Sequence, residues 1–205
     1  MNLIERAKNL IIKPKTEWEK ISGENESLPE ILTTYVLPLA LVGSVAAFIG
    51  YGFIGINTGV LDIRIKGTSW GLFIATRFFA TTLLAVFVSA YVVDLLAPSF
   101  GSEKNINRSA QLVAYSYTPA LIGAFLNIVP MIAIIGSLFI FYGIYLWYLG
   151  LGPVKKTPED KKIAYMIISI IILLVVFFMI ALVLGRILGE IFGYGSLGDY
   201  GRFGY

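Results

Sequence analysis

The sequence predicts an all-α, polytopic membrane protein: a helical bundle with five transmembrane helices, preceded by an N-terminal amphipathic interfacial helix. Composition is the first indication, because 57% of the 205 residues are hydrophobic and only 14% are charged. An average soluble domain has about 25% charged residues. The mean hydropathy is +0.80. Uncharged runs of about 20 residues recur along the chain, and a run of that length crosses the hydrocarbon core of a bilayer as a helix.

The first twelve residues predict a short helix. Its apolar side chains fall on one stripe, which consists of Leu3, Ile4, Ala7, Leu10 and Ile11. Pro14 ends this helix, and residues 16–19 begin a second helical turn. Two interpretations are open: the helix lies on the membrane surface, or it is a soluble helix packed on cytosolic loops. A polar linker completes the N-terminal region, residues 1–30.

The membrane domain is expected over residues 31–192. Its five predicted spans are residues 31–56, 70–96, 109–129, 131–151 and 163–184, with the last helix extending toward residue 192. Small residues in the first span, including Gly43 and Gly50, predict close helix contact. The link at residues 127–130 is so short that the third and fourth spans are expected to form an antiparallel hairpin. A Gly- and Tyr-rich tail, residues 193–205, is expected to be flexible.

The distribution of lysine and arginine predicts the orientation. Eleven of these residues precede the first span or lie in the loops after the second and fourth spans, whereas four lie on the opposite side. Because cytoplasmic segments carry the excess of basic residues, this bias places the N-terminus in the cytosol and the C-terminus outside. The expected location is the cytoplasmic (inner) membrane, as a multi-pass protein.

Polar side chains within the predicted spans are the candidate functional residues. Arg77 and Asp94 lie in the second span, where charges are costly and mark function by default. They are 17 residues apart on one helix, or about 25 Å at 1.5 Å per residue, so they cannot pair with each other. The remaining candidates all come from the third span: Gln111, Tyr115, Thr118, Pro119 and Asn127.

Pro119 is expected to kink the third span. It has no N–H for the carbonyl of Tyr115, and its ring crowds that carbonyl, so a kink is expected. Tyr115, Thr118, Pro119 and Ile122 share one face of the helix. Two interpretations are open: this face packs into the bundle with its hydroxyls satisfied, or it lines a hinge or a small polar cavity.

Aromatic residues near the ends of the predicted helices are expected to anchor the protein at the headgroup level; they are Trp18, Tyr142, Tyr145 and Trp147. The chain has no His and no Cys, which removes imidazole acid–base catalysis, thiol chemistry and Cys/His zinc sites. It also lacks a P-loop, and its scattered basic residues do not favour nucleic-acid binding. We therefore expect no catalytic residue, no cofactor and no metal.

Three segments together resemble the Yip-domain family of membrane proteins, in its prokaryotic branch. They are NLIIKPKTEWEKI near the N-terminus, LLAPSFGSEKNINRSAQLVAYSYTPALI around the third span, and YGIYLWYLGLGPVKKTPEDKK before the last span. The resemblance implies a five-span bundle with a cytosolic N-terminus. Eukaryotic members, the Rab/Ypt-interacting proteins, act in vesicle trafficking. Their long N-terminal region is much shorter here, and their Asp-Leu-Tyr-Gly-Pro motif is absent, which argues against Rab binding.

The predicted function is that of a non-enzymatic scaffold or adaptor. Its expected partners are membrane lipids and other membrane proteins or further copies of itself, and nucleic acid is not expected among them. The alternative is a small channel or transporter component with a polar path near Pro119. Arg77, Asp94 and the polar residues of the third span motivate that alternative.

Overall fold

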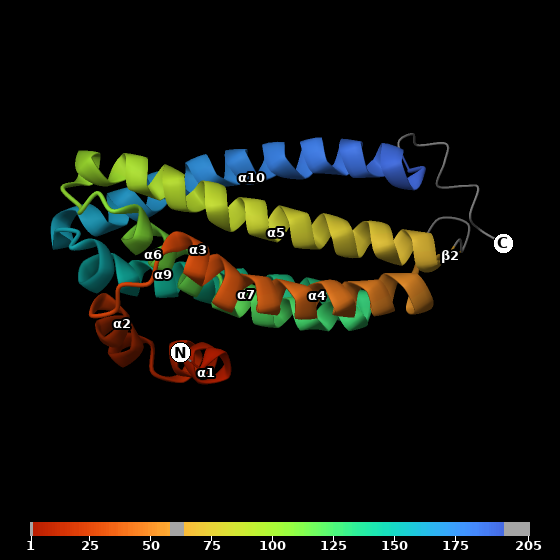
Figure 1. The fold of residues 1–205 in the computed structure, drawn as a ribbon, viewed down its shortest axis with the longest axis horizontal. Coiled ribbons are helices and arrows are strands. Elements are labelled where there is room, and N and C mark those ends of the chain that lie inside the picture. Colours follow the sequence, from red (N-terminus) through yellow and green to blue (C-terminus); the bar gives the residue numbers. More distant parts are fainter. Residues whose placement is uncertain (1, 58–63, 195–205) are drawn as a thin grey trace. The chain divides into compact units, whose positions relative to one another are not determined.

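The computed structural model describes residues 2–57 and 64–194; all but the first two residues of the predicted tail lie outside these ranges. The described chain is almost entirely helical (Figure 1). Four helical stretches within it are long and apolar enough to cross a membrane: Leu28–Ile54, Thr68–Phe100, Pro130–Lys155 and Glu159–Phe192. The prediction of an all-α polytopic membrane protein is confirmed, although this count differs from the expected five.

The difference lies in the third predicted span, residues 109–129. Instead of one continuous helix, the structure has α6 (Ile106–Ser116), a turn at Tyr117, α7 (Thr118–Gly123) and a 3₁₀ turn over Ala124–Ile128. Pro119 explains the interruption, because a proline cannot donate to the carbonyl four residues earlier and its ring displaces that carbonyl. The kink expected from Pro119 is therefore a break in the helix, and no single piece has the length of a span.

The chain divides into two compact units, which are described separately. Unit 1 comprises Met1–Pro38, Leu83–Pro119 and Ile140–Phe177; unit 2 comprises Leu39–Thr82, Ala120–Phe139 and Phe178–Tyr205. Two long helices contribute one part to each unit. They are α5 (Thr68–Leu96) and α10 (Lys162–Phe192), drawn in yellow-green and blue in Figure 1.

Unit 1 contains the N-terminal helices α1 (Leu3–Ile12), α2 (Pro14–Ser22) and α3 (Leu28–Ile31), together with α6 and α9 (Phe139–Lys155). Local sequence signals set where these helices start. The Asn2 side chain accepts hydrogen bonds from the first turn of α1, and α2 begins with a proline. Ser27 and Glu30 form a reciprocal capping box on α3.

A π-helical turn, Leu32–Val36, continues α3 and ends just before Pro38. The missing N–H of that proline disturbs the normal helical ladder around it, which accounts for the wider turn. The turn holds Tyr35, and its side chain is fully buried in the core of unit 1.

Unit 2 contains α4 (Leu37–Ile49, its first two residues belonging to unit 1), α8 (Ala133–Ser137) and most of α7. β1 (Ile56–Asn57) and β2 (Arg64–Ile65) form a short antiparallel ribbon with Ile56 opposite Ile65. The close contact predicted for Gly50 is confirmed, because a Cβ there would lie 2.0 Å from the carbonyl oxygen of Asn127. An aromatic cluster of Trp70, Phe73 and Tyr194 is part of the core of this unit.

Candidate functional site: the polar face of α6

The polar residues of α6 bind the N-terminal segment of the chain. We call the side chains of Asn107, Arg108, Gln111 and Tyr115 the docking face, and residues 2–27 the N-terminal segment. The docking face follows from helical geometry, because positions i, i+1, i+4 and i+8 lie on one side of a helix. Asn105 fixes the start of α6 by accepting hydrogen bonds from the backbone of Asn107 and Arg108.

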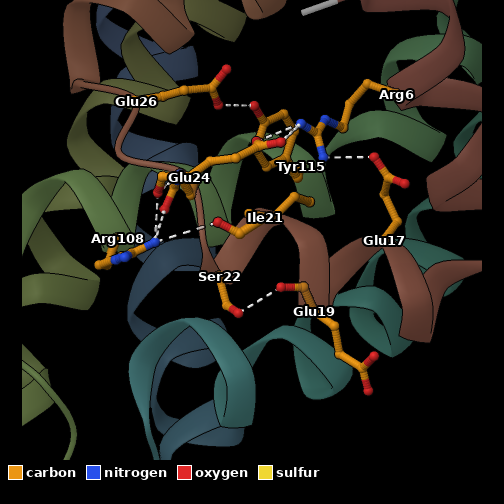
Figure 2. Close-up of polar contacts among 10 residues, drawn as sticks. Arg6, Glu17, Glu19, Ile21, Ser22, Glu24, Glu26, Arg108 and Tyr115 are labelled. Atoms are coloured by element: carbon orange, nitrogen blue, oxygen red, sulfur yellow. Dashed lines mark hydrogen bonds and ion pairs between the residues drawn. The ribbon is translucent and has the colours of Figure 1, made fainter.

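The N-terminal half of the docking face satisfies backbone groups where α2 ends and the linker begins. The Arg108 guanidinium donates to the carbonyls of Glu24 at 2.8 Å and Ile21 at 3.4 Å (Figure 2). The Gln111 amide donates to the Glu24 carbonyl at 3.1 Å. Asn107 accepts from the backbone N–H of Leu28 at 3.1 Å. These bonds supply partners to backbone groups at the end of α2, in the linker and at the start of α3, which would otherwise need water.

Arg6 is the charged centre of the N-terminal segment. Its guanidinium donates to Glu17 at 2.6 Å and to Glu24 at 2.5 Å, and the arginine side chain is only 1% exposed (Figure 2). It also lies over the ring of Tyr115, 5.3 Å from the ring centroid, which is within the range of a cation–π contact. Arg6 therefore joins α1, α2, the linker and α6.

The protonation of Arg6 is secure. Burial alone would lower the pKa of the guanidinium, but the hydrogen bond to Glu24 and the charges of the nearby carboxylates outweigh burial and raise that pKa. A raised pKa adds stability that is fully present below the ordinary arginine value and is lost only as the pH rises through the raised value. The ion pairs of Arg6 thus persist throughout the physiological range.

Tyr115 is the last member of the docking face along α6. It is fully buried, and its hydroxyl donates to the carboxylate of Glu26 (Figure 2). Its ring meets the ring of Tyr35 edge-on at 4.9 Å between centroids and that of Trp18 at 6.3 Å. Thr118 is also fully buried, and its hydroxyl is 2.7 Å from the Tyr35 hydroxyl. Both hydroxyls that were candidates for a polar path are therefore satisfied within the protein.

A polar cavity of about 280 Å³ lies on the N-terminal segment. Its lining is made by Asn2, Glu5, Arg6, Asn9, Glu17, Lys20, Glu24 and Glu26. All eight lining residues come from the N-terminal segment, and Pro119 is not among them.

The four residues predicted as interfacial anchors differ in how far they are buried in the protein. Trp18 is 1% exposed and packs on Gly150 of α9, where a Cβ would be 2.9 Å from the indole ring. Trp147 is also buried, so both tryptophan side chains pack within the protein, and their place at the headgroup level stays a prediction. Tyr142 donates to the carbonyl of Ile11 at 2.8 Å and fastens the end of α1 to α9. Tyr145, at 43% exposed, is free to reach an interface.

Asp94 belongs to a second buried cluster in unit 1. The Lys155 ammonium is fully buried, 3.3 Å from the Asp94 carboxylate and 2.7 Å from the Ser109 hydroxyl. The same hydroxyl donates to Asp94 at 3.0 Å. The cluster ties together the ends of α5 and α9 and the start of α6, so the Asp94 carboxylate has an ion-pair partner within unit 1.

The two remaining candidates, Arg77 and Asn127, lie in unit 2. The Arg77 guanidinium lies against Gly185 of α10, where a Cβ would be 3.5 Å from the guanidinium carbon. The Asn127 amide donates to the carbonyl of Ala124 in its own turn, at 2.8 Å. The structure thus groups Gln111, Tyr115 and Thr118 near the N-terminal segment and places Asp94 beside Lys155. Arg77 and Asn127 belong to neither group.

Sequence reasoning missed seven residues of the two clusters: Arg6, Glu17, Glu24, Glu26, Asn107, Arg108 and Lys155. A signal for Arg6 was present, because it falls three residues after Leu3 and four before Leu10 and so lies within the apolar stripe of α1. Glu17 similarly shares a helical face with Trp18 and Ile21, and all three are buried. The linker glutamates and Lys155 carry no comparable signal, because their sequence surroundings are typical of solvated loops.

Comparison with known proteins agrees with this architecture. The Yip1 domain model matches residues 8–181. The chain is 28% identical, over 161 residues, to the inner membrane protein YohC of Escherichia coli K12 and to that of E. coli O6:H1; the match covers 76% of this chain and 82% of each relative. No solved structure matches. The apolar helices and these relatives indicate a multi-pass protein of the cytoplasmic membrane, and the match over most of the chain shows that it belongs to the Yip1-domain family.

Proposed function

We propose that this protein is a non-enzymatic membrane scaffold whose docked N-terminal segment is its platform for partner membrane proteins. The observation that carries the proposal is that the polar side chains of α6 hold the N-terminal segment. Arg108, Gln111 and Tyr115 are hydrogen-bonded to that segment, and Thr118 is hydrogen-bonded to Tyr35. A chain that buries this many polar groups to hold a short N-terminal segment in place is suited to presenting a fixed surface.

The platform is proposed to face the cytosol. The support is the bias of eleven to four in lysine and arginine between the two sides of the membrane. The alternative of a transport path near Pro119 has weaker support, because Tyr115 and Thr118 are fully buried and have hydrogen-bond partners within the protein.

Two measurements test the proposal. A photo-crosslinking residue at the exposed Glu19 of α2 should capture specific membrane proteins, or a second copy of the chain, in cells. These adducts should disappear when Arg6→Met releases the segment, whereas Lys104→Met, at an exposed position outside the N-terminal segment, should leave them. The proposal fails if Glu19 captures no defined partner, or if proteoliposomes show an ion flux that Arg77→Ala abolishes.

A further inference from the structure

Helix α1 has two different faces, and the docked state uses only one of them. Arg6, Ala7 and Leu10 are buried against the protein. The opposite face is a ridge of Ile4, Lys8 and Ile12, spaced at i, i+4 and i+8. Ile4 is 75% exposed and Ile12 is 61% exposed. We call these three residues the outer ridge.

The surface around the outer ridge is basic. The exposed basic side chains of α1, α2 and the residue between them are Lys8, Lys13, Lys15 and Lys20, against the exposed acids Glu5 and Glu19. Arg6 and Glu17 do not contribute, since each is buried and paired with the other. The outer ridge therefore offers two large apolar side chains within a net positive surface.

We propose that the outer ridge binds the surface of an anionic bilayer, with Ile4 and Ile12 at the acyl boundary and Lys8, Lys13 and Lys15 at the lipid phosphates. A bilayer surface satisfies both kinds of side chain at once, because apolar residues enter below the headgroups while lysines reach the phosphates. The proposal rests on the proposed function, since it takes the N-terminal segment to be docked on the cytosolic side.

The position of α1 in the chain supports this occupant. The helix ends at Ile12, and the first membrane-spanning stretch begins at Leu28. Tyr142, in another such stretch, holds the Ile11 carbonyl. The outer ridge is thus attached at two points to helices that cross the membrane. The outer ridge shares only Ile4 with the apolar stripe predicted from the sequence, because two other members of that stripe, Ala7 and Leu10, are buried in the protein.

The test uses the full chain, which contains no cysteine, so a single introduced cysteine carries the only spin label. Ile4→Cys, Ile12→Cys and the control Glu19→Cys are labelled and placed in nanodiscs with one copy each, so that a second copy cannot cover the ridge. The lipids are phosphatidylcholine alone or an equal mixture with phosphatidylglycerol. Accessibility to oxygen and to a water-soluble nickel chelate then reports the depth of each label.

In the anionic nanodiscs, labels at positions 4 and 12 should be protected from the nickel chelate and accessible to oxygen, while the label at position 19 stays in water. Replacing Lys8, Lys13 and Lys15 with glutamine should weaken the preference for phosphatidylglycerol by about fivefold per lysine. The proposal would be overturned if the nickel chelate reached the labels at positions 4 and 12 as readily as the label at position 19. Protection that is equal in the two lipids and insensitive to the lysine changes would also overturn it. Either result leaves the scaffold proposal standing if the Arg108 crosslink described below still forms.

Discussion

Replacing Arg6 with methionine should release the N-terminal segment from α6. The guanidinium is buried between Glu17 and Glu24, and the Glu17 side chain is 6% exposed. Arg6→Met therefore strands a buried carboxylate, and breaking a buried pair by removing one partner typically costs about 3–5 kcal/mol. We use the lower end, because the Glu24 side chain is 28% exposed and water will solvate it after the change. About 3 kcal/mol corresponds to an increase of roughly a hundredfold in the open population.

Thiol labelling measures this opening directly. Ala7 is 7% exposed on the inward face of α1, so Ala7→Cys introduces a single thiol that reacts with a maleimide only when the segment opens. Arg6→Met should raise its labelling rate by roughly a hundredfold, and the control change Lys104→Met, at an exposed position outside the segment, should leave the rate unaltered. Adding Glu17→Leu to Arg6→Met should restore much of the protection, because it removes the stranded charge. Equal labelling rates for Arg6→Met and Lys104→Met would refute the reasoning.

Three further predictions concern unit 1. Tyr115→Phe leaves the carboxylate of Glu26 without its phenol donor and should destabilise docking by about 1–3 kcal/mol, seen as faster labelling of the same thiol; an unchanged rate would contradict it. Asp94→Asn removes the counter-charge of the fully buried Lys155 and should cost about 3–5 kcal/mol, measured as a lower unfolding temperature in detergent. Gly143→Ala would place a Cβ 2.7 Å from the carbonyl oxygen of Ser116 and should destabilise by about 1–3 kcal/mol through overpacking; an unaltered unfolding temperature would show that the helices separate freely.

Much of the fold could be predicted from the sequence because its hydropathy pattern is strong. Long uncharged runs have few alternatives to membrane helices. The short link at residues 127–130 gave the hairpin correctly: Gly123 and Gly136 meet so closely that a Cβ on Gly123 would lie 2.4 Å from the Gly136 carbonyl oxygen. The predicted and observed numbers of span-length helices differ at residues 109–129, because a hydropathy pattern does not show that Pro119 breaks the helix.

The site was predictable in part. Tyr115, Gln111 and Thr118 attract attention as polar residues in an apolar setting, and the structure gives each of them a hydrogen-bond partner within the protein. Their partners could not be identified, because contacts between positions about 85 residues apart depend on how the helices pack. Trp18 shows the same limit, since its amphipathic side chain suits both a headgroup layer and the protein interior, and packing on Gly150 places it in the interior.

The measurement that tests the central claim most directly is photo-crosslinking from position 108 of α6. The Arg108 side chain reaches the carbonyls of Ile21 and Glu24 and the side chain of Asn25. A benzophenone amino acid at this position, in the full chain in membranes, should form an intramolecular adduct that mass spectrometry maps to residues 21–25. The same probe at the exposed Lys104 should not give that adduct. Adducts from position 108 that map only to other parts of the chain or to lipid would contradict docking of the N-terminal segment on α6.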